Sequence, residues 1–277
     1  MRKSMRVAAV AAGTGVVLTG AAIAPVAADA GNGVPTITVS MAKTISVSAG
    51  STVHAGRVVF KVTAPSDPGD HELQLLKLRN GYTVSDFKRD AGPGFDGGVV
   101  AATRRIYKGV NFFGGAMAGQ SFSETLYAGT YYLIDIGNNS RVVKTLHVVG
   151  TPPQRGWIGD GSVITAHDMS FTENEKIPGK GWTIFRNTGD EPHFLSMVRV
   201  KASTTRADVK KALESDQQPS FAIGPDLELG IVSPGSQIVF KHDLPAGKYL
   251  ALCFMSDPDN HDMPHAMMGM YQFLTVK

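Results

Sequence analysis

The residues best suited to chemistry lie at the C-terminal end of this 277-residue chain. The last 25 residues hold five of the 11 methionines, two of the eight histidines and the single cysteine, Cys253. Thiolate, imidazole and thioether groups together suit copper, whose Cu(I) and Cu(II) states both accept one cysteine, two histidines and a weak methionine. Zinc also binds cysteine and histidine, but it gains little from methionine. The segment therefore favours a copper site over a zinc site.

Cys253 is expected at the end of a β-strand. The run Lys248–Met255 is short, apolar and aromatic, and a loop rich in Asp and Pro follows it. Alternation along this strand puts four residues on one face, namely Tyr249, Ala251, Cys253 and Met255. The thiol is therefore expected where the strand ends and the histidine-containing loop begins.

A second imidazole has to come from another part of the fold. His193 follows Pro192 and an Asn-Thr-Gly-Asp turn at residues 187–190, and it opens the strand-like run His193–Val200. A β-sandwich gathers its loops and strand ends at its two poles. We expect His193 at the same pole as the loop that follows Cys253.

These segments, in this order, resemble a cupredoxin, a member of the blue or type 1 copper protein family. The resemblance rests on His193, on Cys253 in a strand introduced by Ala-Gly-Lys-Tyr, and on the His-x-x-x-Gly-Met sequence of residues 265–270. It covers residues 157–277 well and residues 31–150 more weakly, through an internal repeat. The Pro-His and Cys-Phe contexts are similar to those of exported bacterial members.

The resemblance implies a Greek-key sandwich with one copper ion and a role in electron transfer. It makes His193, Cys253 and His265 the strong ligands and Met270 the axial ligand. Eleven residues separate Cys253 from His265, which is longer than the loop of small blue copper proteins, so other registers stay open. The alternative ligands are His261 in place of His265, and Met267 or Met268 in place of Met270.

Landmarks that recur in the same order indicate two copies of one unit. His71 and His193 are 122 positions apart, and Thr83 and Thr205 have the same separation. Each threonine begins a Thr-x-x-Asp sequence, which is typical of a helix start. A later Leu-x-Ala-Gly sequence recurs at a separation of 118. Units of this spacing match the usual size of a domain.

The repeat predicts a first domain at residues 31–150 and a second at 151–277, with the proline-containing sequence at 151–156 as the linker. In the first domain Asp135 stands where the second has Cys253, so a copper site is expected in the second domain only. Among the other histidines, His71 is expected in a surface or turn position and His147 within a strand, whereas His54, His167 and His242 are expected to be solvated or structural.

The fold class follows from many short strand-like runs and few helical ones. In the second unit Gly, Pro and Asp turns separate these runs, and one short helix is expected at Thr205–Glu214. A parallel α/β sheet would need a helix between most strands. We therefore predict an all-β protein of two tandem Greek-key sandwiches, each with one short helix. The expected strands are Trp182–Thr188, His193–Val200, Gln237–His242, Lys248–Met255 and Met270–Val276.

The first 30 residues have the three parts of an export signal. Three basic residues within the first six precede an apolar stretch from residue 7 to 26, and an Ala-x-Ala exit ends at Ala30. We expect cleavage there rather than a membrane anchor, because Gly and Thr interrupt the apolar stretch. No later stretch reaches 18 consecutive apolar residues, so the mature chain is expected to lack a transmembrane segment and to be secreted or held in the cell envelope.

The chain after the leader is nearly neutral. Of 27 basic and 24 acidic residues, the leader takes three and one, which leaves 24 and 23. There is no Lys/Arg cluster, so neither nucleic acid nor an anionic membrane is an expected partner. A lone cysteine in an oxidising compartment cannot form an internal disulfide, which raises the expectation of metal ligation.

Three functions fit this sequence. The first is an exported electron-transfer protein with mononuclear copper and an unidentified redox partner. The second is Cu(I) storage or delivery to a copper-exchange partner, and the third is a metal-free tandem sandwich that binds another molecule. An enzyme is not expected, because the chain has no Gly-x-Ser-x-Gly, His-x-His or His-Cys-His sequence.

Overall fold

The structure, a computed structural model, describes residues 33–66, 69–79, 81–95, 98–137, 139–152, 161–173, 176–215 and 219–277. The predicted export signal, residues 1–30, and residues 153–156 of the predicted linker lie outside these ranges. Within the described ranges, no helix is both long enough and apolar enough to cross a membrane.

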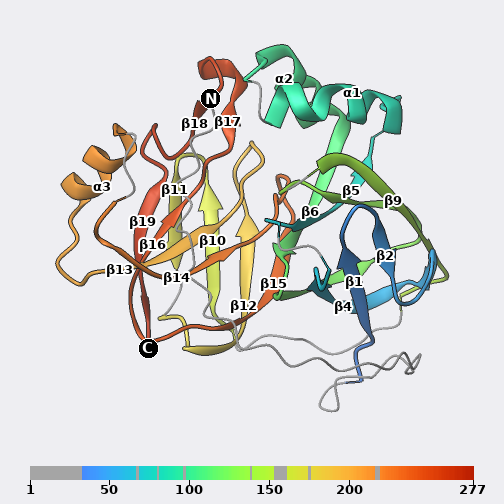
Figure 1. The fold of residues 1–277 in the computed structure, drawn as a ribbon, viewed down its shortest axis with the longest axis horizontal. Coiled ribbons are helices and arrows are strands. Elements are labelled where there is room, and N and C mark those ends of the chain that lie inside the picture. The colour runs from blue at the N-terminus through green and yellow to red at the C-terminus, as the bar shows by residue number, and fades with distance from the viewer. Residues whose placement is uncertain are drawn as a thin grey trace.

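The N-terminal half, residues 33–152, forms two β-layers around one core (Figure 1). One layer is a sheet in the order β3-β9-β8-β5-β6, and the other contains β7, β4, β1 and β2 as neighbours in that order. Phe60 of β4 and Phe122 of β7 stack with their ring centroids 5.0 Å apart, in the same core cluster as Leu75 and Leu133 of the first layer. The bounds are β1 Thr36–Met41, β2 Ile45–Val47, β3 Thr52–His54, β4 Gly56–Thr63, β5 Glu72–Leu78, β6 Val110–Met117, β7 Ser121–Leu126, β8 Gly129–Asp135 and β9 Asn139–Val149.

The C-terminal half, residues 161–277, has the same two-layer form. One layer is a sheet in the order β14-β13-β16-β19, and the other contains β11, β10, β12 and β15. The bounds are β10 Val163–His167, β11 Ser170–Glu173, β12 Lys180–Asn187, β13 Ser196–Val200, β14 Ala222–Glu228, β15 Gln237–Asp243, β16 Gly247–Leu252 and β19 Tyr271–Val276. A short hairpin contains β17 Ser256–Asp257, the 3₁₀ helix η1 Pro258–Asn260 and β18 Met263–Pro264.

The two halves share a sheet. β15 pairs antiparallel with β7, with Phe240 opposite Phe122, so one eight-stranded sheet runs β11-β10-β12-β15-β7-β4-β1-β2. The outer sheets stay separate, each within its own half. The prediction of an all-β protein is confirmed, whereas the pairing that makes one sheet common to both halves has no counterpart in the sequence analysis.

A buried side-chain amide also links the two halves through hydrogen bonds. Gln74 on β5 is fully buried; its Oε1 accepts a hydrogen bond from the Ile231 N–H at 2.6 Å, and its Nε2 donates to the Ile231 carbonyl at 3.0 Å. Gly230 lies so close to Gly115 of β6 that a Cβ on Gly230 would lie 2.5 Å from the backbone N of Gly115. These contacts fix residues 229–232 against the N-terminal half.

The N-terminal half has two helices, α1 (Val84–Phe95) and α2 (Val100–Gly109), where one was predicted. α1 continues through Pro93, and α2 starts without a side-chain cap. The prediction of one short helix is therefore wrong for this half. Gly and Pro around residues 92–98 indicate a loop, whereas burial of Ala102 and Ile106 against the core stabilises α2.

Both predicted helix starts are present. The Asp86 N–H donates to Thr83 Oγ1 at 3.1 Å, and the Thr83 N–H donates to the Asp86 carboxylate at 2.9 Å. Thr205 and Asp208 repeat this capping box at 3.2 and 2.8 Å. The helix that Thr205 begins, α3 (Arg206–Leu213), is the one α-helix among the described residues of the C-terminal half.

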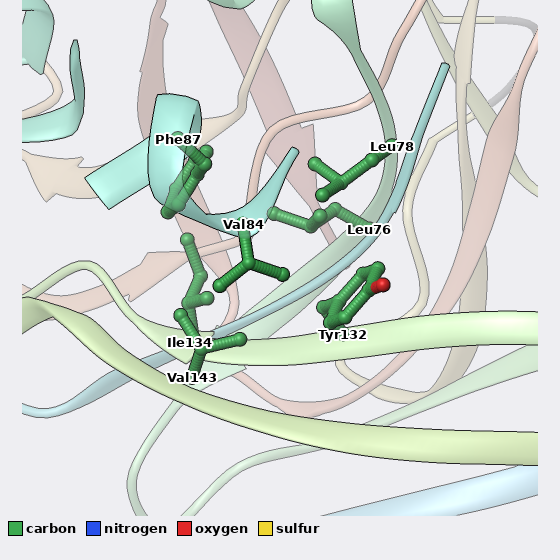
Figure 2. Close-up of a pocket in the computed structure, with 7 residues that line it drawn as sticks. All are labelled: Leu76, Leu78, Val84, Phe87, Tyr132, Ile134 and Val143. Atoms are coloured by element: carbon green, nitrogen blue, oxygen red, sulfur yellow. The ribbon is translucent and has the colours of Figure 1, made fainter. Parts of the chain in front are cut away.

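The apolar face of α1 packs on the outer sheet of the N-terminal half (Figure 2). Val84 and Phe87 of the helix face side chains from β5, β8 and β9. Phe87 is fully buried, and burial of this kind contributes about 1.5–3 kcal/mol. The facing side chains are Leu76, Leu78, Tyr132, Ile134 and Val143.

A buried carboxylate joins α1 to α2. Asp90 accepts hydrogen bonds from the guanidinium groups of Arg105 at 2.8 Å and Arg89 at 2.9 Å, and from the Tyr82 hydroxyl at 3.0 Å. The bonds from Arg105, followed by those from Arg89, hold the pKa of Asp90 far below its usual range. Because Arg105 lies on α2, this cluster fixes α2 relative to α1.

Asp90→Asn is expected to lower the free energy of unfolding by about 2 kcal/mol near neutral pH, because charge-assisted hydrogen bonds lose their negative acceptor. The folded-state pKa of Asp90 lies below its unfolded value, so this contribution is complete above about pH 5 and declines as the pH falls below about 4. Urea unfolding at about pH 7 and about pH 3 measures the difference between the variant and the wild type.

Lys180→Ala is the control for this experiment, because it removes an exposed ion pair with Asp243. Its expected effect is below about 0.5 kcal/mol at either pH. A difference between Asp90→Asn and the wild type that stays constant down to about pH 3 contradicts the charged cluster.

Candidate metal centre

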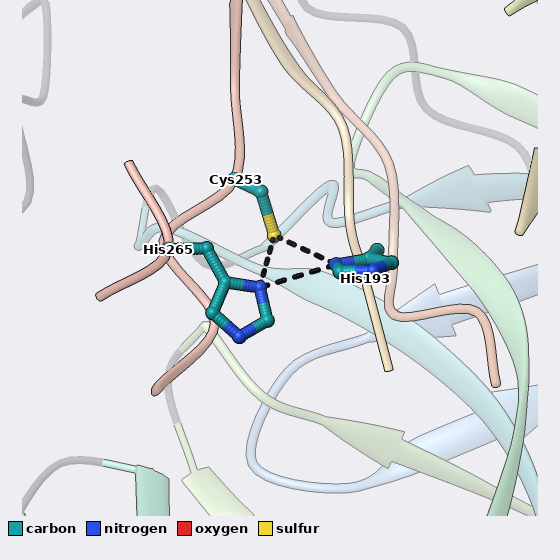
Figure 3. A group of neighbouring side chains, drawn as sticks. All are labelled: His193, Cys253 and His265. Atoms are coloured by element: carbon teal, nitrogen blue, oxygen red, sulfur yellow. Dashed lines mark hydrogen bonds between the residues drawn. The ribbon is translucent and has the colours of Figure 1, made fainter. Parts of the chain in front are cut away.

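Cys253, His193 and His265 meet at one buried point (Figure 3). The Cys253 Sγ lies 3.8 Å from the Nδ1 of His193 and 3.7 Å from the Nδ1 of His265. The two Nδ1 atoms are 3.1 Å apart. All three residues have 0% relative exposure. The structure thus brings together the three residues that the sequence indicated as strong ligands.

Cys253 directly follows the last residue of β16, at the end of the predicted strand. Leu250 and Leu252 belong to one core cluster, whereas Cys253 belongs to the larger one, as alternation along a strand requires. The Cys253 N–H donates to the Met270 carbonyl at 3.3 Å, and the Cys253 carbonyl accepts from the Ala266 N–H at 2.6 Å. Backbone bonds on both sides therefore hold the thiol in place.

His265 is presented by the short hairpin that begins after Met255. β17 and β18 pair antiparallel, with Ser256 opposite Pro264, and η1 lies between the two strands. The His265 N–H donates to the Met255 carbonyl at 2.8 Å. The Asp257 carboxylate stabilises the turn of the hairpin, because it caps η1 by accepting hydrogen bonds from the N–H groups of Asp259 and Asn260. The hairpin therefore sets the position of the second imidazole.

His193 is held by backbone contacts just before a strand. Its N–H donates to the Val232 carbonyl at 3.1 Å, and the Val232 N–H donates back to the His193 carbonyl at 2.7 Å. The buried Asn187 side chain donates to the carbonyls of Val232 at 2.8 Å and Glu191 at 2.7 Å. The strand β13 begins at Ser196, so His193 lies in the approach to the strand rather than at its first residue.

The outer nitrogens of both imidazoles face carboxylates. His265 Nε2 lies 2.8 Å from Glu191 Oε2, and His193 Nε2 lies 3.5 Å from Asp168 Oδ1. A carboxylate on the far nitrogen of a metal-binding histidine fixes the orientation of the ring and raises its basicity. Both contacts leave Nδ1 directed towards Cys253.

Cys253 and His265 favour each other's charged form. Burial raises the pKa of Cys253, but hydrogen bonding to His193 and His265 outweighs burial and lowers the pKa to about 6. Burial lowers the pKa of His265, but Cys253 and Glu191 outweigh it and raise the pKa to about 9. Near neutral pH the cluster therefore favours a thiolate beside an imidazolium. The thiolate is the form of cysteine that binds metals.

The spacing of the three donor atoms fits a single metal ion. Bonds of about 2.0 Å to nitrogen and 2.3 Å to sulfur place donor atoms around one ion roughly 3–4 Å apart. The observed separations of 3.1, 3.7 and 3.8 Å fall in this range. One thiolate with two imidazoles is also a donor set that copper accepts. Fold and site together define a β-sandwich protein with a buried centre suited to a soft metal ion.

Met270 is the fully buried member of the three predicted methionines, and its backbone bonds to both Cys253 and His265, whereas Met268 bonds to the His265 carbonyl alone of these two, at 3.0 Å. The Met270 N–H donates to the His265 carbonyl at 2.9 Å, and the Met270 carbonyl accepts from the Cys253 N–H. Met267 is 53% exposed, and Met268 is partly exposed. His261 is exposed and ends η1 in a left-handed conformation with φ 59°, outside the group of His193, Cys253 and His265.

At the corresponding place in the N-terminal half, His71 contacts Asp135. The Nδ1 of His71 lies 2.5 Å from Asp135 Oδ2, and both residues are buried. The sequence context of His71 predicted a surface or turn histidine, so the burial corrects that prediction. An ionisable carboxylate in the core gives the imidazole a partner that makes its burial tolerable.

Sequence reasoning missed the residues that orient the imidazoles. Asn187 was recognised only as part of a turn, and Glu191 was not singled out although it lies two residues before His193. An acidic residue beside a candidate ligand was the available signal for Glu191. Asp168 gives no such signal, because it reaches His193 through the pairing of β10 with β12.

No protein-family model and no curated protein matches the chain. Among solved structures, the chain is similar to auracyanin B, with 19% identity, a TM-score of 0.27 and coverage of 42% of this chain and 86% of that chain. It is similar to auracyanin A, a blue copper protein from Chloroflexus aurantiacus, with 16% identity, a TM-score of 0.28 and coverage of 41% and 98%. A copper nitrite reductase from Nitrosomonas europaea shares 11% identity at a TM-score of 0.25, with coverage of 87% and 93%.

Auracyanin A and the nitrite reductase are copper proteins. Identities of 11–19% and TM-scores of 0.25–0.28 do not carry a function over to this chain. The nature of the centre therefore rests on the positions and chemistry of its own side chains.

Glu191→Gln is expected to lower the pKa of His265 from about 9 in the metal-free protein, because the imidazolium loses an adjacent negative charge. An NMR titration of the His265 ring protons measures the midpoint. Asp190→Asn removes the same charge one residue earlier and is expected to shift that midpoint less. Equal midpoints in the wild type and in Glu191→Gln contradict the Glu191–His265 ion pair.

Proposed function

We propose that this protein is an exported electron-transfer protein with one type 1 copper ion, held by His193, Cys253 and His265. The observation that carries the proposal is the convergence of one Sγ and two Nδ1 atoms, 3.1–3.8 Å apart, in a place without solvent exposure. Met270 is the proposed axial ligand, since it is buried and bonded through its backbone to Cys253 and His265. Copper, when bound, supplies a one-electron redox change.

A fixed set of ligands supports electron transfer in particular. Backbone hydrogen bonds join Cys253 to the segments that carry His265 and Met270. Close packing of a protein interior leaves little room for these groups to rearrange. Glu191 and Asp168 hold the two rings from outside. The donor atoms therefore keep nearly the same positions while the charge of the centre changes.

Protons are part of metal loading. The metal-free cluster favours a thiolate on Cys253 and an imidazolium on His265. An imidazole nitrogen must be free of its proton to bind a metal ion, so Nδ1 of His265 releases its proton when the centre is filled. Glu191 stays beside Nε2 and keeps that nitrogen protonated.

Cu(I) storage or delivery is the second candidate function. Met263 and Met267 are 44% and 53% exposed on the segment that carries His265, and surface thioethers suit capture of Cu(I). The His193, Cys253 and His265 side chains are buried, however, which favours a retained ion over an exchanging one. Electron transfer is therefore the better supported function.

The two halves are proposed as duplicated domains, residues 31–150 and 151–277. The strand order β2-β1-β4-β7 corresponds to β11-β10-β12-β15, and β6-β5-β8-β9 corresponds to β14-β13-β16-β19. The two halves also share a parallel pair at the same place, β1 with β4 and β10 with β12, and the N-terminal half has a further one, β3 with β9. Export through a cleaved signal at residues 1–30 and a protein redox partner complete the proposal.

The purified protein is expected to bind one Cu(II) ion per chain and to show an intense visible thiolate-to-copper charge-transfer band. Cys253→Ser is expected to abolish the band, because the sulfur that gives rise to it is gone. Metal analysis and visible absorption spectroscopy measure both properties. His261→Ala is the matched control, since His261 is exposed and lies on the same loop outside the cluster.

Two other outcomes separate the alternatives. Stoichiometric Cu(I) binding without a visible band in the Cu(II)-treated protein supports storage. A wild-type protein that takes up neither form of copper supports a metal-free function and removes the proposal.

Met270→Leu is expected to keep the copper and its visible band but to change the reduction potential, because a weak axial ligand tunes the potential of such a centre. Met267→Leu is the control, because Met267 is 53% exposed. Protein-film voltammetry measures both potentials. An unchanged potential in Met270→Leu, together with a shift in Met267→Leu, reassigns the axial ligand.

A further inference from the structure

Helix α2 of the N-terminal half contacts the hairpin between the cysteine and histidine ligands of the C-terminal half (Figure 1). The Tyr107 hydroxyl donates to the Ser256 carbonyl at 2.6 Å. Arg104 Nη2 donates to the Pro258 carbonyl at 2.8 Å and to Asp259 Oδ1 at 2.8 Å. Arg104 and Tyr107 are three residues apart on the helix, so they lie on the same face.

The contacted residues belong to the chain segment that connects Cys253 to His265. Ser256 belongs to β17, which pairs with β18, and His265 follows β18 without a gap. The His265 N–H also bonds to the carbonyl of Met255, the residue before β17. Any displacement of β17 therefore moves the backbone of His265.

The restraint comes from the two bonds to backbone carbonyls. The side chains of Arg104 and Asp259 are 56% and 76% exposed, so solvent screens their ion pair. The bonds to the carbonyls of Ser256 and Pro258 act on the main chain itself. They fix the hairpin whatever side chains it carries.

In the part of the chain that the structure describes, the helix of the C-terminal half makes no such hydrogen bond to the N-terminal half. This helix, α3, starts at a Thr-x-x-Asp sequence, as α1 does. Arg206 of α3 stacks over the Tyr271 ring and bonds to Gln272, both in the same half. Among the described residues, α2 has no counterpart after α3. The half in which Asp135 replaces the cysteine thus contributes an additional helix that contacts the hairpin of the other half.

We propose that α2 is a positioning element for the metal centre, in which Arg104 and Tyr107 hold residues 256–259 so that His265 faces Cys253. The N-terminal half then completes a site whose ligands all belong to the C-terminal half. The effect on copper rests on the proposed function, whereas the position of the hairpin can be measured without metal.

The test uses Arg104→Gln, Tyr107→Phe and the double variant, which remove the bonds and keep most of each side chain. Arg199→Gln and Tyr249→Phe are matched controls, because Arg199 and Tyr249 donate similar bonds to backbone carbonyls at the opposite end of β16 from Cys253. The first measurement is amide hydrogen exchange over residues 256–265 in the metal-free protein. Exchange is expected to rise about tenfold in the double variant and to stay unchanged in the controls.

The second measurement is the rate of copper release to a chelator, together with the visible charge-transfer spectrum. Release from the double variant is expected to be about tenfold faster, with a shifted band, because a ligand loses its outer support. Wild-type exchange in the double variant overturns the proposal, and so does an equal rise in the controls. If the wild type binds no copper, the proposed function fails, and hydrogen exchange alone decides whether α2 positions the hairpin.

Discussion

The structure depends on holding a thiolate and two imidazoles together away from water. Burial alone raises the pKa of Cys253 and lowers that of His265, which opposes the charged forms. Facing each other, the two groups reverse this preference, and Glu191 adds a negative charge on the outer side of His265. A cluster of this kind is stable only if its backbone is fixed, and that requirement explains the dense hydrogen bonding of the segments around it.

The ligands come from segments far apart in the sequence, so the register of the strands determines the site. His193 precedes β13 and Cys253 directly follows β16, and these strands pair antiparallel. A slip of one residue would turn Cys253 towards the other core cluster. Residues 229–232, which hold His193 in place, are themselves fixed by Gln74 of the N-terminal half. The geometry of a site in one half therefore depends on contacts with the other.

Much of the C-terminal half could be predicted because its signals are local. The apolar run at residues 248–255 and the Asp- and Pro-rich loop after it placed Cys253 at a strand end, and the capping sequence at Thr205 marked the start of α3. Features that depend on tertiary contacts have no comparable local signal in the sequence. Asp168 reaches an imidazole only through strand pairing, and α2 is stabilised by its buried face without a capping residue. The shared sheet arises from a pairing between distant strands, which periodicity cannot show.

X-ray absorption spectroscopy of the copper-loaded protein tests the central claim most directly, because it reports the atoms bound to the ion. The proposed centre predicts one short bond to sulfur and two bonds to imidazole nitrogen. A first shell of nitrogen and oxygen without sulfur would contradict the assignment of Cys253 and, with it, the proposed function.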